Sequence, residues 1–162
     1  MNGRVLVAYD GKHGATGEIA ERIGKVLHEA GLAVEVLPAV RVGDPAAYGA
    51  VVLGSAIYMG MWRKGAARFL KANETALAGL PVWLFSSGPT GEGDLDTLMR
   101  GWTFPKGLQP VADRIQPRGA TIFRGAFDVA KANWFERWIM KKVNAAAGEF
   151  RDWQAIEAWA QG

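Results

Sequence analysis

Apolar and polar residues alternate along this chain in blocks that predict strands and helices in turn. Residues 5–9 and 50–53 are apolar on consecutive positions, which is typical of strands buried on both faces of a parallel sheet. Apolar residues at helical spacing fill the stretches between them, as Ile19, Ile23 and Leu27 do. The predicted strands cover residues 4–9, 33–37, 50–55, 82–86 and 121–126. The predicted helices cover residues 14–30, 63–78, 134–146 and 152–160, with short helical turns at 44–48, 95–100 and 110–115.

Strands that alternate with helices predict an α/β fold with a parallel sheet. In such folds ligands bind at the carboxyl ends of the strands. Three loops rich in Gly, Ser, Thr or aromatic residues follow predicted strands, at 10–16, 55–62 and 87–93, and we expect them to meet. We find no repeat and no linker, so residues 1–162 are expected to form a single domain.

Composition narrows the classes of function. The chain has no cysteine and only two histidines, which excludes disulfides and argues against a metal site. Neither a secretory signal nor a membrane-spanning segment is evident, so we expect a cytoplasmic protein. Its pI of about 9.3 suits nucleic acid, an anionic lipid surface or an acidic small molecule as partner, although a merely solvated basic surface explains it equally well. We expect no nucleic-acid partner.

The segment VLVAYDGKHGATGEIA, residues 5–20, predicts a phosphate site. A strand stops at a glycine-bearing loop and a helix begins at once, which aims backbone N–H groups and the helix dipole at one spot. The spacing of Gly11, Gly14 and Gly17 fits neither the Walker pattern nor the dinucleotide pattern. A nucleophile elbow is also absent. A mononucleotide remains as the predicted ligand.

These motifs resemble those of a known family. YDGKHGATGEIA resembles the phosphate loop of flavodoxins, GSAIYMGMW their second flavin loop, and SSGPTG their third. The order of elements is also similar. The chain most resembles the flavodoxin-like proteins related to menaquinone-dependent protoporphyrinogen IX dehydrogenase, whose aromatic-basic helix and D-W segment correspond to WFERWIMKKV and FRDWQAIEAWA.

The resemblance implies a three-layer flavodoxin-like fold, a five-stranded parallel sheet of order 2-1-3-4-5, and one FMN at the carboxyl ends of strands 1, 3 and 4. It implies an FMN-dependent oxidoreductase that dehydrogenates a porphyrinogen-type or other small substrate and passes electrons to a quinone. The catalytic residue is unknown. The implied cofactor-binding residues are Asp10, Gly11, Lys12, His13, Gly14, Ala15, Thr16, Ser55, Ala56, Ile57, Tyr58, Met59, Gly60, Ser86, Ser87, Gly88, Pro89, Thr90 and Gly91.

Two positions depart from the family's phosphate loop. Asp10 and Gly11 stand where Ser or Thr usually donates to the phosphate. We expect the Asp10 carboxylate to repel the phosphate unless it turns away, for example to cap loop amides. Thr16 is expected to bond a phosphate oxygen, although an ordinary helix cap would look the same. An aromatic side chain, Tyr58 or Trp62, is expected either to stack on the flavin or to pack on the protein.

Alternatives of other classes stay open. The chain could be an electron-transfer protein that shuttles electrons between redox-protein partners, or a flavin-type fold that has lost its cofactor. Helix 134–143 combines aromatic and basic residues and is expected to be either a core helix with a solvated edge or a docking surface. In the second case the protein lies at the inner face of the membrane, next to its quinone.

Overall fold

The computed structural model describes residues 3–11, 14–58, 60–88, 103–124, 126–127, 148–149 and 151–161. The strands are β1 (Arg4–Asp10), β2 (Ala33–Pro38), β3 (Ala50–Tyr58), β4 (Met61–Trp62), β5 (Val82–Ser87), β6 (Gly119–Phe123), β7 (Ala126–Phe127) and β8 (Gly148–Glu149). The α-helices are α1 (Ala15–Glu29), α2 (Lys64–Ala72), α3 (Glu74–Ala78), α5 (Gln109–Ile115) and α7 (Trp153–Gln161). The 3₁₀ turns are η1 (Ala39–Arg41), η2 (Pro45–Ala47) and η3 (Lys106–Leu108).

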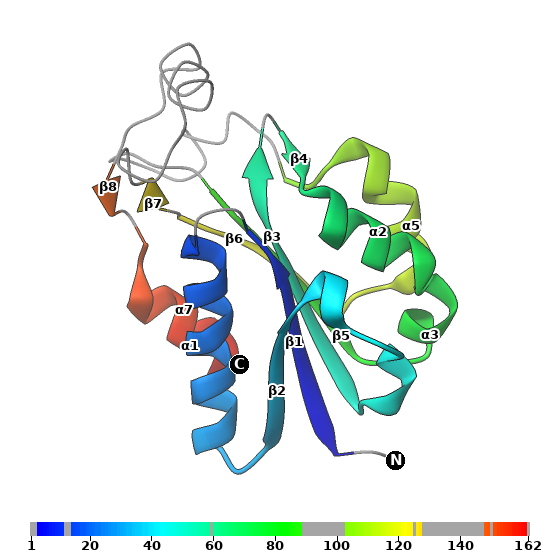
Figure 1. The fold of residues 1–162 in the computed structure, drawn as a ribbon, viewed down its shortest axis with the longest axis horizontal. Helices are drawn as coiled ribbons and strands as arrows, with labels where there is room; N and C mark the ends of the chain where they lie inside the picture. The colour runs from blue at the N-terminus through cyan, green and yellow to red at the C-terminus, as the bar shows by residue number, and fades with distance from the viewer. Residues whose placement is uncertain are drawn as a thin grey trace.

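Five strands form a parallel sheet in the order β2-β1-β3-β5-β6 (Figure 1). The two-residue strand β4 lies off this path and pairs antiparallel with the end of β3. Without β4, the five strands stand in chain order 2-1-3-4-5, which confirms the predicted flavodoxin-like sheet. The reversal of order between β1 and β3 is the switch point at which ligands of this class of sheet bind.

Helices cover both faces of the sheet, with α1 and α7 on one face and α2, α3 and α5 on the other (Figure 1). Successive residues of β1 point to opposite faces, so Leu6 packs with the α2 side and Val7 with the α1 side. Each face has its own buried cluster, centred on Leu70 and Leu77 in one and on Ile23 and Ile156 in the other. This two-sided burial explains the continuous apolar runs of the central strands.

The structure differs from the expected elements in two places. The predicted helix 63–78 is two helices, α2 and α3, which meet at Asn73. The Asn73 side-chain amide donates to the Phe69 carbonyl over 2.9 Å and satisfies the end of α2, which permits the break. The last sheet strand begins earlier than predicted and ends at Phe123. The predicted helices at 95–100 and 134–146 lie outside the described residues, whereas the one at 152–160 is α7.

Among the residues that the structure describes, no helix is both long enough and apolar enough to cross a bilayer.

Candidate functional site

The ends of three neighbouring strands form the candidate site. Asp10 of β1 is paired in register with Ser55 of β3, and Ser55 with Ser86 of β5. The loops after these strands therefore start side by side at the carboxyl edge of the sheet, as the sequence predicts. The start of α1 lies next to this edge (Figure 1).

The N-terminus of α1 is built to leave its amides open. Its N-cap, Gly14, adopts φ 89°, a left-handed conformation that glycine accepts easily, and no described side chain caps the helix. Gly11 is required for a different reason than Gly14. A Cβ at position 11 would lie 2.7 Å from the Thr16 Cβ, so a side chain there would clash. The unbonded first-turn N–H groups and the helix dipole thus favour an anion at this point. This geometry fits a phosphate group.

Thr16 lies in the first turn of α1 and is only 2% exposed. Its hydroxyl lies 3.2 Å from the hydroxyl of Ser87, which is buried to the same degree. This bond ties the first loop to the end of β5. A hydroxyl has one donor and two acceptor positions, so Thr16 can keep this bond while the pair also presents an O–H group to a ligand.

Asp10 turns away from the first loop, but not to cap loop amides as expected. One carboxylate oxygen accepts a hydrogen bond from the Arg63 Nε over 3.1 Å, and the other accepts one from the Ala66 backbone N–H over 3.2 Å. Asp10 therefore caps the start of α2 and neutralises Arg63, which would otherwise oppose the helix dipole. Its negative charge is directed at α2 rather than at the α1 amides.

The other buried serines hold the second and third loops in place. The Ser55 hydroxyl accepts a bond from the Arg63 N–H over 3.0 Å and donates to the Ala56 carbonyl over 2.9 Å. The Ser86 hydroxyl accepts a bond from the Trp62 indole N–H over 2.8 Å. Both hydroxyls accept a hydrogen bond within the protein, and the Ser55 hydroxyl also donates one, so these bonds hold the two loops in position.

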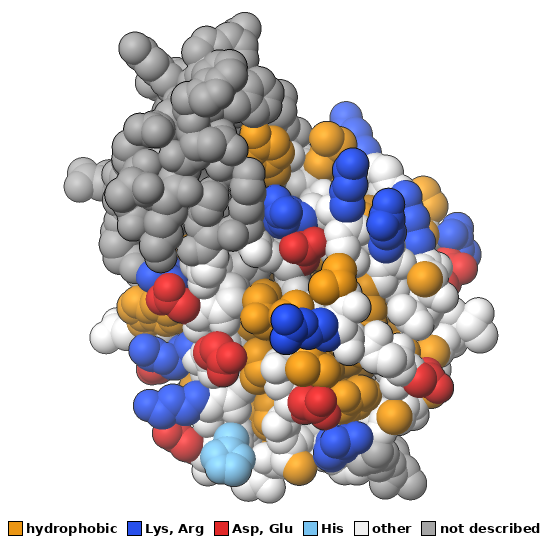
Figure 2. Space-filling model, viewed as in Figure 1, with side chains coloured by type: hydrophobic (Ala, Val, Ile, Leu, Met, Phe, Trp, Pro, Cys, Tyr) orange, Lys and Arg blue, Asp and Glu red, His pale blue; other side chains and the backbone are white. Residues whose placement is uncertain are grey.

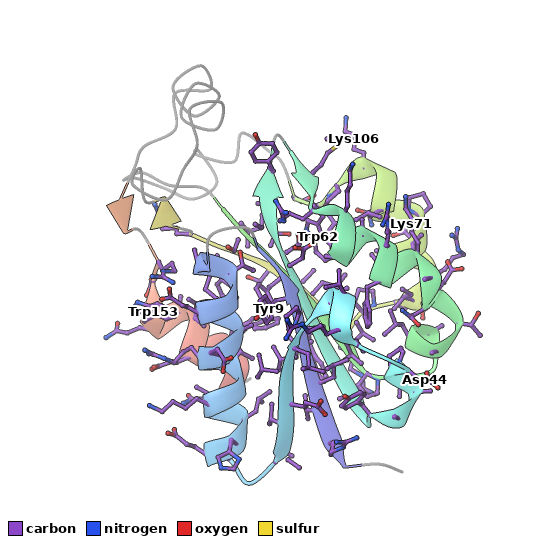
Figure 3. All side chains as sticks on the ribbon, viewed as in Figure 1. Tyr9, Asp44, Trp62, Lys71, Lys106 and Trp153 are labelled. Carbon is purple, nitrogen blue, oxygen red and sulfur yellow. The ribbon has the colours of Figure 1, made fainter. Side chains whose placement is uncertain are left out.

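The two aromatic residues of the second loop have different surroundings. Trp62 is 6% exposed, and its ring meets Phe104 edge-on at 5.1 Å, so it packs in the core and does not form a stacking surface (Figure 3). Tyr58 is 38% exposed at the end of β3 and remains available. A Cβ on Gly88 would lie 3.0 Å from the Ile57 Cβ, so the second and third loops approach closely.

Arg151 is a site residue that sequence reasoning missed. Its side chain is 8% exposed and donates to the Ala15 carbonyl over 3.3 Å and to the Glu18 carboxylate over 3.1 Å. Its guanidinium also lies over the ring of Trp153, which Figure 3 labels beside α1. A residue just before α7 thereby fixes the first turn of α1. The only sequence signal was its place in the FRDW segment.

Some predicted site residues lie outside the described residues: Lys12, His13, Met59, Pro89, Thr90 and Gly91. The aromatic-basic helix 134–143 does so too. Burial and the hydrogen bond to Glu35 raise the pKa of Tyr48 above its ordinary value. Tyr48 just precedes β3 and so lies at the opposite end of that strand from the candidate site.

Comparisons with known proteins agree with this geometry. A family model described as a flavodoxin domain matches residues 6–154. The quinone-type protoporphyrinogen IX dehydrogenase of Escherichia coli strain K12 is 20% identical over 169 aligned residues, which cover 98% of this chain and 93% of that protein.

Two solved structures show the likeness of fold. The flavodoxin of Streptococcus pneumoniae TIGR4 aligns with a TM-score of 0.60 at 14% identity, over 98% of this chain and 95% of that one. A mutant flavodoxin of Fusobacterium nucleatum, bound to flavin mononucleotide, aligns with a TM-score of 0.50 at 17% identity, over 74% of this chain and 68% of that one.

Proposed function

We propose that this chain, which belongs to the flavodoxin domain family, binds one FMN at the carboxyl ends of β1, β3 and β5 and uses it for oxidoreduction. One observation carries the proposal: the uncapped start of α1 lies beside the ends of three adjacent strands. In this arrangement the α1 amides and Thr16 hold the phosphate. The backbone of residues 55–58 and 86–88 borders the flat ring.

FMN, when bound, supplies reversible transfer of one or two electrons, and the protein binds, orients and shields it. The described residues supply the holding groups. Thr16 and Ser87 join the phosphate end to the ring end, because their hydroxyls are hydrogen-bonded across the two loops. Trp62 and Ser86 fix the second loop against β5. Arg151 keeps the first turn of α1 in position.

The proposed substrate is a porphyrinogen-type or similar small molecule, with a quinone as electron acceptor. The relative from Escherichia coli supports this proposal, because its likeness extends over 98% of this chain. Reduction of a membrane quinone requires the flavin edge to reach a bilayer, so we propose a cytoplasmic protein that associates peripherally with the membrane.

A second candidate function is electron transfer between redox-protein partners, as in flavodoxins. The structural likeness to flavodoxins favours it. The basic charge, with a pI of about 9.3, argues against it, because electron carriers of this type usually present an acidic face to their partners.

Two measurements test the proposed function. Titration of the purified protein with FMN should give saturable quenching of flavin fluorescence, whereas FAD and NAD should compete poorly. The FMN-loaded protein should then be reduced by a porphyrinogen under anaerobic conditions and reoxidised by a quinone. If FMN binds but neither reactant exchanges electrons, the electron carrier becomes the preferred function. Absence of FMN binding would indicate a fold that has lost its cofactor.

A further inference from the structure

Helix α2 carries an unbalanced row of positive charge. Lys64, Arg68 and Lys71 are spaced four and three residues apart, so they share one face of the helix, and all three are exposed. The helix sequence KGAARFLKA contains no acidic residue. Like charges at this spacing repel each other by a few tenths of a kcal/mol per pair. The row is therefore a small cost to stability that no residue of the helix offsets.

Within the part of the chain that the structure describes, the neighbouring elements do not neutralise this row. No described acidic side chain forms an ion pair with Lys64, Arg68 or Lys71, nor with the exposed Lys106 of η3. Lys106 follows closely on Phe104, whose ring packs on Trp62 just before α2. Figure 2 shows Lys and Arg side chains gathered over this region, and Figure 3 labels Lys71 and Lys106 within it.

The described acidic residues near this row of cations are few, and they interact with other residues. Asp10 is paired with Arg63, and Glu74 of α3 with Arg114 of α5. Asp113 of α5 is exposed and accepts a hydrogen bond from Gln109 over 2.8 Å. Counted over the described residues alone, the cations of α2 and η3 thus exceed the unpaired acidic groups near them.

Exposed apolar side chains lie at the start of the same region. Met61 is 62% exposed and Tyr58 is 38% exposed, and the two are paired across the β3–β4 hairpin that leads into α2. Val40, 77% exposed, adjoins the first turn of α2, where a Cβ on Gly65 would lie 3.0 Å from its Cγ1. Apolar and aromatic tips flanked by lysines are the composition of surfaces that insert shallowly among lipid headgroups.

We propose that this region, called here the α2 surface and made of Tyr58, Met61, Lys64, Arg68, Lys71 and Lys106, docks on a bilayer that contains anionic lipid. The cations attract the negative headgroups, and Tyr58 and Met61 enter the interface. An acidic protein would match the same charge. We commit to the bilayer because the cations form an exposed row along the side of α2, which suits an extended anionic surface.

The α2 surface lies beside the candidate flavin site, so docking would bring that site close to the bilayer. The hairpin with Tyr58 continues directly from the carboxyl end of β3, which borders the candidate flavin site. Docking would bring that edge to the bilayer, where a quinone resides. The docking itself does not require flavin, but its value for quinone reduction rests on the proposed function.

Co-sedimentation of the FMN-loaded protein with vesicles tests the proposal. Phosphatidylcholine vesicles with phosphatidylglycerol should bind the protein at low salt, and vesicles of phosphatidylcholine alone should bind it far more weakly. Binding should fall as salt rises to about 0.5 M, because the screening length shortens below about 10 Å. Absence of binding to the anionic vesicles would overturn the proposal, and FMN titration of the same sample would show whether the flavin function fails with it.

A matched pair of variants locates the surface. Arg68→Gln with Lys71→Gln should weaken binding roughly thirty-fold at low salt, because each cation near an anionic surface contributes roughly five-fold. Lys25→Gln with Arg118→Gln removes the same charge from exposed positions outside the α2 surface and should have little effect. Equal loss in both variants would overturn the proposal.

Two further measurements separate the bilayer from other partners. Met61→Ser should weaken the binding that survives at high salt, since it removes an apolar tip without a change of charge. Polyglutamate of similar charge density should compete with the vesicles less well than phosphatidylglycerol vesicles themselves do. If polyglutamate binds the protein and the vesicles do not, the surface serves an acidic protein and the proposal is wrong.

Discussion

Helices α1 and α2 follow neighbouring strands and cover opposite faces of one sheet. They differ in whether their N-termini are capped and in whether their charged side chains have partners. No side chain that the structure describes caps the start of α1, whereas the Asp10 carboxylate caps the start of α2. Two charged side chains of α1 are paired with the C-terminal segment, Arg22 with Glu157 over 2.6 Å and Glu18 with Arg151 over 3.1 Å. Those of α2 have no such partners among the described residues.

This difference indicates which part of each helix is suited to bind an anion. An uncapped N-terminus offers backbone N–H groups to a small anion, so in α1 the N-terminus is the expected binding site. A capped N-terminus cannot do so, and α2 instead offers a row of cations along its side, which suits an extended anionic surface. Asp10, at the end of β1, caps the N-terminus of α2 and not that of α1, so only the N-terminal amides of α1 are left for a ligand.

The buried clusters on the two faces of the sheet should contribute similarly to the free energy of unfolding, so that the two sides differ in charge and not in packing. Ile156→Ala in α7, on the α1 face of the sheet, and Leu77→Ala in α3, on the α2 face, each remove a fully buried side chain. Each should lower the free energy of unfolding by about 3 kcal/mol. Urea unfolding followed by tryptophan fluorescence measures both. A cost below about 1 kcal/mol for Ile156→Ala would mean that α7 is not an integral cover of that face.

The open end of α1 should depend on Thr16 for binding. Thr16→Val keeps the shape and removes the hydroxyl, and it should weaken FMN binding by about 2 kcal/mol, the value of a hydrogen bond to a charged group. Fluorescence quenching measures the change. Ser87→Ala breaks the same interloop bond from the other side and is the control. If the two variants lose equal affinity, Thr16 only holds the loops together and does not contact the phosphate.

The capped end of α2 should depend on Asp10 for stability. Asp10→Ala removes a half-buried cap and leaves Arg63 unpaired, and it should lower the free energy of unfolding by about 1.5 kcal/mol. Asp44→Ala removes an exposed aspartate that accepts the Ala46 N–H over 2.9 Å, and it should cost about 0.5 kcal/mol. Thermal unfolding of the two variants side by side measures the difference. A similar loss in both would show that the Arg63 pair contributes nothing.

The smallest effect concerns the repulsion along α2. Arg68→Glu places a negative charge between Lys64 and Lys71 and should raise the free energy of unfolding by about 0.5 kcal/mol, while it weakens vesicle binding. Lys25→Glu on α1 adds to the negative charge of Glu21 and Glu29 and should act in the opposite direction on stability. Chemical denaturation at low salt measures both. If Arg68→Glu destabilises the protein, α2 has a partner for Arg68 that offsets the repulsion.

Much of the fold could be predicted because its causes are local. The apolar runs of β1 and β3, the helical spacing of Ile19 and Ile23, and the glycine at the start of α1 each act over a few residues. A strand–loop–helix unit with these features has few alternatives, and right-handed crossovers then limit the sheet order. The location of the candidate site at the strand ends follows from the same local signals.

What only the tertiary structure decided is the partner of each polar side chain. The sequence places a carboxylate at Asp10, but the distance from it to α2 spans more than fifty positions, and only the packed sheet brings Arg63 to it. The sequence likewise marks Trp62 as a candidate for the flavin, and burial against Phe104 assigns it to the core. Arg151 reaches Ala15 only because α7 docks beside α1. Periodicity fixes which face of an element is buried, whereas hydrogen-bond partners depend on elements that are distant in the chain and meet only after folding.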